Sequence, residues 1–339
     1  MMKIKRSYCF DDVLLVPQRS DILSRKEIDL SSQLDDKNTF DLPIISSPMD
    51  TVTESAMSIA MNHAGGLGII HRYNTIEDQS ALVRDVGEFS GDVGAAIGVT
   101  GDYLERASEL CLAGANMICV DIAHGHHFMM KHALHKLRRD LGDDVHLIAG
   151  NVATLAGFND VADWGADSVR VGIGGGSICS TRIHTGHGVP TLQSILDCSH
   201  SDRDVSLIAD GGIRTSGDIV KALAAGADFV MLGSLLAGTD ESPGDEIYRG
   251  GAKYKTYRGM ASVEAQIQWR GHTASVEGVS SQVPWKGSVR GVLERLERGI
   301  RSGLSYTGAR TIRELQSFSE FIEQSSSGAV ESSTHINNS

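Results

Sequence analysis

One cysteine of this 339-residue chain lies beside a glycine-rich segment. Residues 172–188 read GIGGGSICSTRIHTGHG, which places Cys179 directly after the glycines and before a second flexible stretch. Glycines let backbone N–H groups gather around an anion such as a phosphate. A thiolate beside that anion can attack whatever the phosphate holds in place. The segment therefore predicts a substrate that is bound through its phosphate group while the Cys179 thiolate attacks another part of the same molecule. The alternative is a buried structural cysteine near a turn.

The overall composition narrows the classes of function. Hydrophobic residues make up 41% of the chain, and 38 glycines with few aromatic residues suit an α/β enzyme with many tight loops. A formal net charge of −12 argues against a nucleic-acid partner. No apolar run is long enough to span a bilayer, and the first residues do not resemble a signal peptide. The five cysteines show no CxxC spacing, so we expect reduced thiols, a cytoplasmic location and no membrane partner.

Eight short apolar runs recur along the chain, each ending at a small or polar residue. They are Pro43–Ser47, Leu67–His71, Val93–Val99, Met117–Asp121, His146–Gly150, Ser168–Gly172, Ser206–Asp210 and Phe229–Gly233. Runs that are apolar throughout are expected for parallel strands covered on both sides. Helical patterns separate them, and a Gly-Ala-Asx phrase precedes three of them, at residues 114–116, 165–167 and 226–228. Eight such units predict a single-domain (β/α)8 TIM barrel. A doubly wound sheet is the weaker alternative, because no GxGxxG follows the first run.

The residue types after each run fit this prediction, because chemistry in a TIM barrel sits just beyond the strand ends. Polar, glycine or charged residues follow the runs at 47–50, 71–72, 121, 150–151, 172–188, 210–212 and 233–234. Further along, Tyr257–Met260 opens a polar stretch to about Gly287. Two helical patterns then begin near Val289 and Ile312, and the last residues are rich in Ser and Asn.

Seven motifs, in this order, make the chain similar to the IMP dehydrogenase/GMP reductase family. They are FDDVLLVP (10–17), SSPMDTVTE (46–54), GNVAT (150–154), GGSICSTR (175–182), ADGGIR (209–214), GSLLAGTDESPG (233–244) and YRGM (257–260). The resemblance runs from about Tyr8 to Phe321 and implies the same TIM barrel. We expect residues 1–323 to form the catalytic barrel, with a mobile flap at about 261–287. We expect residues 324–339 to be a disordered tail.

The resemblance leaves two reactions open, and two features favour the reductase. Most dehydrogenases of the family carry inserted CBS regulatory modules between the second helix and the third strand, but Arg72 to Val93 leaves no room for them. Dehydrogenases also carry an Arg-Tyr pair in the flap that activates water, whereas Arg270, the one arginine of residues 261–287, follows Trp269. We therefore expect an NADPH-dependent GMP reductase. The alternatives are an NAD-dependent IMP dehydrogenase lacking CBS modules and a non-catalytic nucleotide-binding barrel.

The resemblance also implies roles for individual residues. Cys179 would be the nucleophile, Thr181 and Glu277 would carry a proton, and Arg72 would be a cation near the reacting end. Asp210 would bind the ribose hydroxyls. The other expected substrate-binding residues are Ser47, Met49, Ser177, Gly211, Gly212, Gly233, Ser234, Tyr257, Gly259 and Met260, of which Ser177, Gly212, Gly233, Ser234 and Tyr257 would hold the phosphate.

Three further expectations concern the cofactor, a metal and assembly. Asp121, Asn151 and Arg270 are the expected contacts of the NADPH cofactor. The family allows potassium on backbone carbonyls of Gly174, Gly176 and Cys179, and its members are mostly homotetramers. The histidines of the HGHH run at 124–127 fit no standard zinc spacing, so we interpret that run as a polar loop rather than a metal site.

Overall fold

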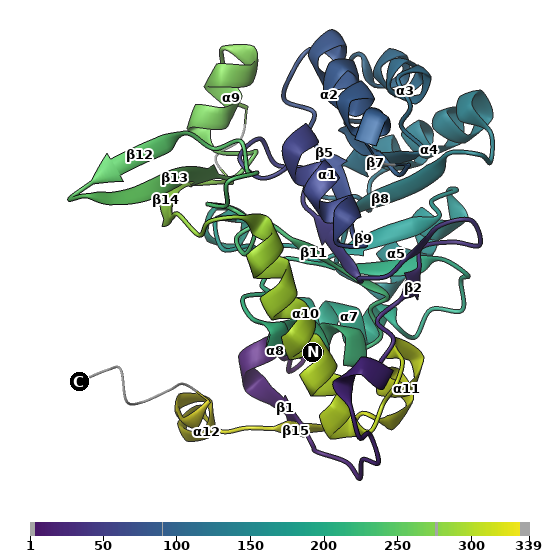
Figure 1. Cartoon of the computed structure of the whole chain (residues 1–339). Coiled ribbons are helices and arrows are strands. Elements are labelled where there is room, and N and C mark those ends of the chain that lie inside the picture. Colours follow the sequence, from purple (N-terminus) through teal and green to yellow (C-terminus); the bar gives the residue numbers. More distant parts are fainter. Residues whose placement is uncertain (1–3, 90, 275–276, 333–339) are drawn as a thin grey trace.

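The computed structural model describes residues 4–89, 91–274 and 277–332. Eight strands form a closed, all-parallel barrel (Figure 1). They are β4 (Ile44–Ser46), β5 (Leu67–Ile70), β6 (Gly94–Ile97), β7 (Met117–Asp121), β8 (His146–Val152), β9 (Ser168–Val171), β10 (Ser206–Asp210) and β11 (Phe229–Leu232). The strands follow chain order around the barrel, which closes where β11 pairs with β4. Each predicted run overlaps one strand, so the predicted TIM barrel is confirmed.

Helices cover the outside of the barrel and alternate with its strands. They are α1 (Ser55–His63), α2 (Ile76–Phe89), α3 (Tyr103–Leu112), α4 (Phe128–Leu141), α5 (Leu155–Asp163), α7 (Thr191–Cys198), α8 (Ser216–Ala224), α10 (Val289–Thr307) and α11 (Ile312–Phe318). The short helix α6 (Thr181–Thr185) lies in the connection after β9 and buries none of its residues. In the described chain, α2 is the element that joins β5 to β6, so no CBS module lies at that point. The apolar residues of α10 recur at helical spacing and are buried, as the sequence predicted.

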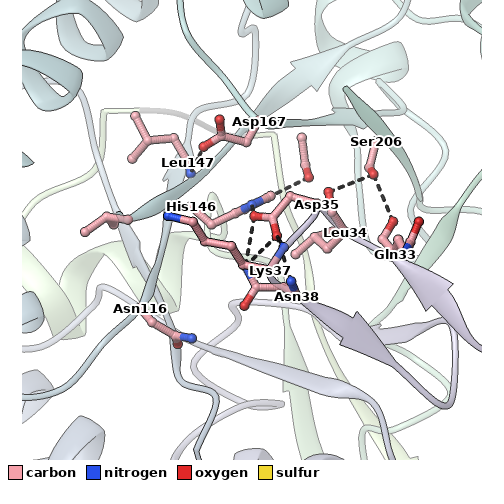
Figure 2. Close-up of polar contacts among 12 residues, drawn as sticks. Gln33, Leu34, Asp35, Lys37, Asn38, Asn116, His146, Leu147, Asp167 and Ser206 are labelled. Atoms are coloured by element: carbon pink, nitrogen blue, oxygen red, sulfur yellow. Dashed lines mark hydrogen bonds and ion pairs between the residues drawn. The ribbon is translucent and has the colours of Figure 1, made fainter. Parts of the chain in front are cut away.

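The Gly-Ala-Asx repeat links the first residues of neighbouring strands by hydrogen bonds. The third residue of each phrase accepts a hydrogen bond from a backbone N–H at the start of the preceding strand. The pairs are Asn116 with Val93 at 2.9 Å, Asp167 with Leu147 at 2.7 Å and Asp228 with Leu207 at 2.8 Å (Figure 2 shows the second). The repeat thus fixes neighbouring strands at the end of the barrel opposite the predicted chemistry.

A short hairpin closes that same end. It consists of β2 (Ser32–Gln33) and β3 (Thr39–Phe40), and its Leu34 and Phe40 belong to the apolar cluster inside the barrel. Asp35 pairs with His146 of β8, whose Nε2 lies 2.7 Å from the Ser168 hydroxyl (Figure 2). Ser168 is fully buried, so this polar chain holds the hairpin on the barrel.

An arm projects from the opposite end of the barrel (Figure 1). It contains a three-stranded antiparallel sheet of β12 (Glu246–Arg249), β13 (Ala252–Arg258) and β14 (Ser280–Pro284), with α9 (Val263–Arg270) inserted after β13. The expected flap at 261–287 therefore includes a helix and a strand, while residues 275–276 lie outside the described residues.

Segments near the two ends of the chain pair with each other beside the barrel (Figure 1). The turn η1 (Phe10–Asp12) leads into β1 (Val13–Leu15), which pairs with β15 (Phe321–Glu323), while η2 (Arg25–Glu27) lies near α10. Within the segment expected to be disordered, Ser326–Glu331 forms the short helix α12. Ser325 caps this helix, and Gln324 bonds to the backbone of η1, so the segment has local partners. Residues 333–339 lie outside the described residues. None of the described helices combines the length and apolarity needed to cross a membrane.

Candidate active site

A cavity of about 310 Å³, hereafter the central cavity, opens at the carboxyl ends of the barrel strands. Its walls come from the loops after β4, β5, β7, β8, β9, β10 and β11, together with Tyr257, residues 259–261 and residues 277–278. This is the end at which TIM barrels place their sites. The predicted residues that line it are Ser47, Met49, Arg72, Asp121, Asn151, Gly174, Gly176, Ser177, Cys179, Thr181, Asp210, Gly211, Gly212, Gly233, Ser234, Tyr257, Gly259, Met260 and Glu277.

A hydrogen-bonded chain links the cysteine to a carboxylate. The Cys179 Sγ lies 3.2 Å from the Thr181 hydroxyl, which donates a 2.8 Å hydrogen bond to Glu277 Oε2. Backbone bonds hold the two segments together, from Ser180 N to the Glu277 carbonyl at 3.0 Å and from Val279 N to the Ile178 carbonyl at 3.1 Å. A proton can therefore pass between the carboxylate and the reacting thiol region through one hydroxyl.

The remaining four cysteines differ from Cys179 in their surroundings. Burial raises the pKa of the thiols of Cys111 and Cys119 to about 11 and that of Cys198 to about 12. Burial and the Asp12 carboxyl also raise the pKa of Cys9. These thiols stay protonated near neutral pH and line no part of the central cavity. This matches the interpretation of them as structural.

Hydroxyl groups gather at one wall of the cavity. The Tyr257 hydroxyl forms side-chain hydrogen bonds with Ser177 and Ser234, and burial raises its pKa. A Cβ placed on Gly233 would lie 3.1 Å from the Tyr257 Oη and 3.0 Å from the Ser47 Oγ, so these groups surround that backbone. Three hydroxyls beside exposed glycine backbone form a suitable cradle for a phosphate.

Glycine is required where the loops after β9 and β10 meet. Gly172 has φ +148°, and a Cβ there would lie 1.9 Å from the Asp210 carbonyl oxygen. Gly211 has φ +92°, and its Cβ would lie 3.1 Å from the Gly176 N. Any side chain at these positions would push the cysteine loop away from Asp210.

A buried arginine that the sequence analysis missed connects two of the predicted residues. Arg170 of β9 donates to Asp121 at 2.7 Å through Nη1 and to Asp210 at 2.8 Å through Nη2. Burial opposes its charge, but Cys119, Asp210 and Asp121 raise its pKa well above the usual value. One feature of the sequence could have identified Arg170. It is an arginine within a predicted buried strand, and a buried charge needs oppositely charged partners.

The predicted cofactor residues divide into two groups. Asp121 and Asn151 line the central cavity. The Asn151 amide donates to the Gly172 carbonyl and to Asp210, both at 2.8 Å. Asn151 therefore also positions Asp210, the carboxylate predicted to bind the ribose hydroxyls. Arg270 does not line the cavity. It ends α9 on the exposed side, and its guanidinium bonds to Gln266 and to the His272 carbonyl. These contacts join its guanidinium to α9 and to the residue that follows Gly271.

The loops expected to bear on metal binding make ordinary polar contacts. The Gly176 carbonyl accepts a 3.1 Å bond from Cys179 N, and Gly174 has φ +82° beside the Arg182 side chain. His126 pairs with Asp160 at 2.7 Å, and His127 accepts from Met129 N and caps α4. Two of the histidines in the HGHH run thus have structural partners.

A family model describing the IMP dehydrogenase/GMP reductase domain matches residues 7–335. The chain belongs to this family. Members are oxidoreductases that act on purine nucleotides with a nicotinamide cofactor. The shared family accounts for the presence of residues from six of the seven sequence motifs in the walls of the central cavity.

Relatives and a solved structure carry both names of the family. Inosine-5'-monophosphate dehydrogenase of Nitrosopumilus maritimus is 36% identical over 472 aligned positions, which cover 98% of this chain and 99% of the relative. GMP reductase of Leishmania major is 32% identical and covers 96% of both chains. A crystal structure of a GMP reductase variant from Trypanosoma brucei, in complex with guanosine 5'-monophosphate, superposes with a TM-score of 0.92 at 31% identity and covers 98% of both chains. The 472 positions exceed the 339 residues of this chain, so the first relative contains inserted residues that this chain lacks.

Proposed function

We propose that this protein is a GMP reductase, which converts GMP to IMP and ammonia with NADPH. The observation that carries the proposal is the chain from Cys179 through Thr181 to Glu277, because expelling an amine requires a proton at the departing nitrogen. The flap supports it further. Its single arginine, Arg270, bonds to Gln266 and to the His272 carbonyl and is not among the residues that line the cavity, where a water activator would have to act.

The proposed reaction begins at the guanine base. The Cys179 sulfur forms a bond to C2, and the bond from C2 to the amino nitrogen breaks. The departing nitrogen takes its proton from Glu277 through Thr181 and leaves as ammonia. Hydride transfer to C2 and loss of the sulfur then release IMP and the thiolate. Tyr257, Ser177 and Ser234 would hold the phosphate, and Asp210 would hold the ribose hydroxyls.

The cofactor side of the cavity fits a nicotinamide nucleotide. The carboxylate of Asp121 and the cation of Arg72 line the same cavity as Cys179 and can bind a carboxamide and ribose hydroxyls. A bound NADPH would supply the hydride. Within the chain, the ion contact between Arg72 and Asp121, at 3.7 Å, and the bond from Arg170 to Asp121 orient this carboxylate for that task.

The second candidate is an IMP dehydrogenase that uses NAD, which the names of several relatives favour. Two incubations separate the candidates: GMP with NADPH, and IMP with NAD. We expect NADPH oxidation with formation of IMP and ammonia in the first, and little XMP in the second. Rapid and sustained XMP formation from IMP and NAD would overturn the reductase proposal.

Substitution of Glu277 tests the proton path within the same reaction. Glu277→Gln keeps the shape but removes the proton, so it should slow single-turnover NADPH oxidation with GMP by about 100-fold, the lower end of general-acid effects. The reverse hydride step, from IMP with NADP, should slow much less. Glu264→Gln is the matched control, because Glu264 is exposed on α9 and lines no part of the cavity. Equal loss in both directions would remove Glu277 from the deamination step.

A further inference from the structure

Four side chains form a continuous stack beside the central cavity. The guanidinium carbon of Arg72 lies 5.4 Å from the centroid of the Tyr73 ring. That ring stacks on Trp269 of α9, with 5.7 Å between centroids and 14° between planes. The Arg106 guanidinium of α3 lies 5.8 Å from the Trp269 ring. Cations are attracted to aromatic faces within about 6 Å, and offset rings attract each other. The stack therefore docks α9 on the barrel.

Arg106 and Arg72, at the two ends of the stack, differ in their hydrogen-bond partners. Arg106 is 3% exposed and donates to Gln79 at 2.7 Å and to Asp102 at 2.8 Å, so it is a fixed anchor. The Arg72 Nε lies 3.7 Å from the nearest Asp121 oxygen, beyond hydrogen-bond distance, and is buried with no hydrogen-bond partner among the described residues. The position of the Arg72 guanidinium consequently depends on the loose ion contact with Asp121 and on the Tyr73 face against which it packs.

The stacked rings also separate three cavities. Tyr73 lines both the central cavity and an outer cavity of about 470 Å³ beside Asp50 and Arg258. Trp269 lines the outer cavity and a side cavity of about 100 Å³, which Arg72 also lines. Loss of the indole would remove the wall that Trp269 forms between the outer and side cavities.

We propose that Trp269 is a positioning residue, which fixes the Arg72 guanidinium at the central cavity by stacking on Tyr73. The role of Arg72 in the reaction rests on the proposed function. The docking of α9 by the stack does not depend on that function, so the two are tested by separate measurements.

Limited trypsin digestion measures docking without any substrate. Arg270 is exposed and follows Trp269 directly, so release of α9 should speed cleavage after it. We expect Trp269→Ala and Tyr73→Ala to raise this cleavage rate several-fold, and Trp269→Phe to restore most of the protection. Ile267→Ala is the matched control, because Ile267 is 51% exposed on the same helix. Unchanged cleavage in Trp269→Ala would overturn the docking role.

Steady-state kinetics measure positioning, in whichever of the two reactions the protein catalyses. We expect Trp269→Ala to lower kcat about ten-fold, the scale of one aromatic contact. The KM for the purine nucleotide should stay within about two-fold, and Trp269→Phe should recover most of kcat. In an Arg72→Ala background, Trp269→Ala should add little, because both changes remove the same interaction. Full additivity of the two losses, or an equal loss in Ile267→Ala, would overturn the positioning role. Faster cleavage with no activity in either assay would contradict the proposed function and leave the docking role supported.

Discussion

Replacement of Asp228 by Asn should stabilise the protein at neutral pH. Asp228 ends the third Gly-Ala-Asx phrase and accepts the Leu207 N–H at 2.8 Å. Burial raises the pKa of its carboxyl from 3.8 to about 6. In the first phrase Asn116 makes the equivalent bond to Val93 with an amide oxygen at 2.9 Å. Asn can therefore keep the hydrogen bond at residue 228 while removing the buried charge.

The size and sign of the effect follow from proton linkage. The folded pKa of Asp228 lies above the unfolded value, so its contribution to stability is fully present below about pH 4 and is lost as pH rises through about 6. One pKa unit corresponds to about 1.4 kcal/mol, so the loss is about 3 kcal/mol. We expect Asp228→Asn to raise the free energy of unfolding by up to about 3 kcal/mol above pH 7, and by little near pH 4.

Urea unfolding followed by circular dichroism, at several pH values between about 4 and 8, measures this difference. Asp167→Asn is the control in the second phrase. Asp167 also pairs with Arg138 at 2.6 Å, so its replacement loses an ion pair and should destabilise the protein near neutral pH. A difference between the wild type and Asp228→Asn that does not change with pH, or a loss of stability above pH 7, would refute the reasoning.

Three further substitutions test the site. Cys179→Ser should lower turnover by on the order of 10³-fold or more while GMP binding, measured by calorimetry, stays nearly unchanged; a hundred-fold loss of affinity would instead make Cys179 a binding or structural residue. Tyr257→Phe should weaken GMP binding by about 1 to 3 kcal/mol, the range for a hydrogen bond to a charged group. Guanosine binding as tightly as GMP would show that Tyr257 holds no phosphate. Arg170→Leu removes the cation that bridges Asp121 and Asp210, which keep only the Arg72 contact at 3.7 Å and the Asn151 amide. It should lower the free energy of unfolding by up to about 3 to 5 kcal/mol, the range for a broken buried ion pair, seen as a lower Tm; an unchanged Tm would contradict the bridging role.

The sequence alone determined the barrel and most of the wall of its cavity. Each strand is a short apolar run, and the carboxyl ends of the strands of a TIM barrel meet at one rim. The local sequence pattern was therefore enough to predict that Asp121, Asn151, Cys179 and Asp210 lie at the same cavity. The resemblance to the family also predicted Glu277 as a site residue, although it lies 96 positions from the Thr181 it contacts.

Only the tertiary structure decided contacts that depend on how separate elements pack. Arg170 is stable inside its strand because strands β7 and β10 bring two carboxylates to it, a fact that no local pattern contains. The bonds of Arg270 to Gln266 and to the His272 carbonyl at the end of α9 are of the same kind, and its contact with the cofactor stays a prediction. The Tyr73–Trp269 stack likewise exists because α9 packs on the loop after β5. Strand periodicity is a property of neighbouring residues, whereas the direction of a side chain at a helix end is set by the surface on which that helix packs.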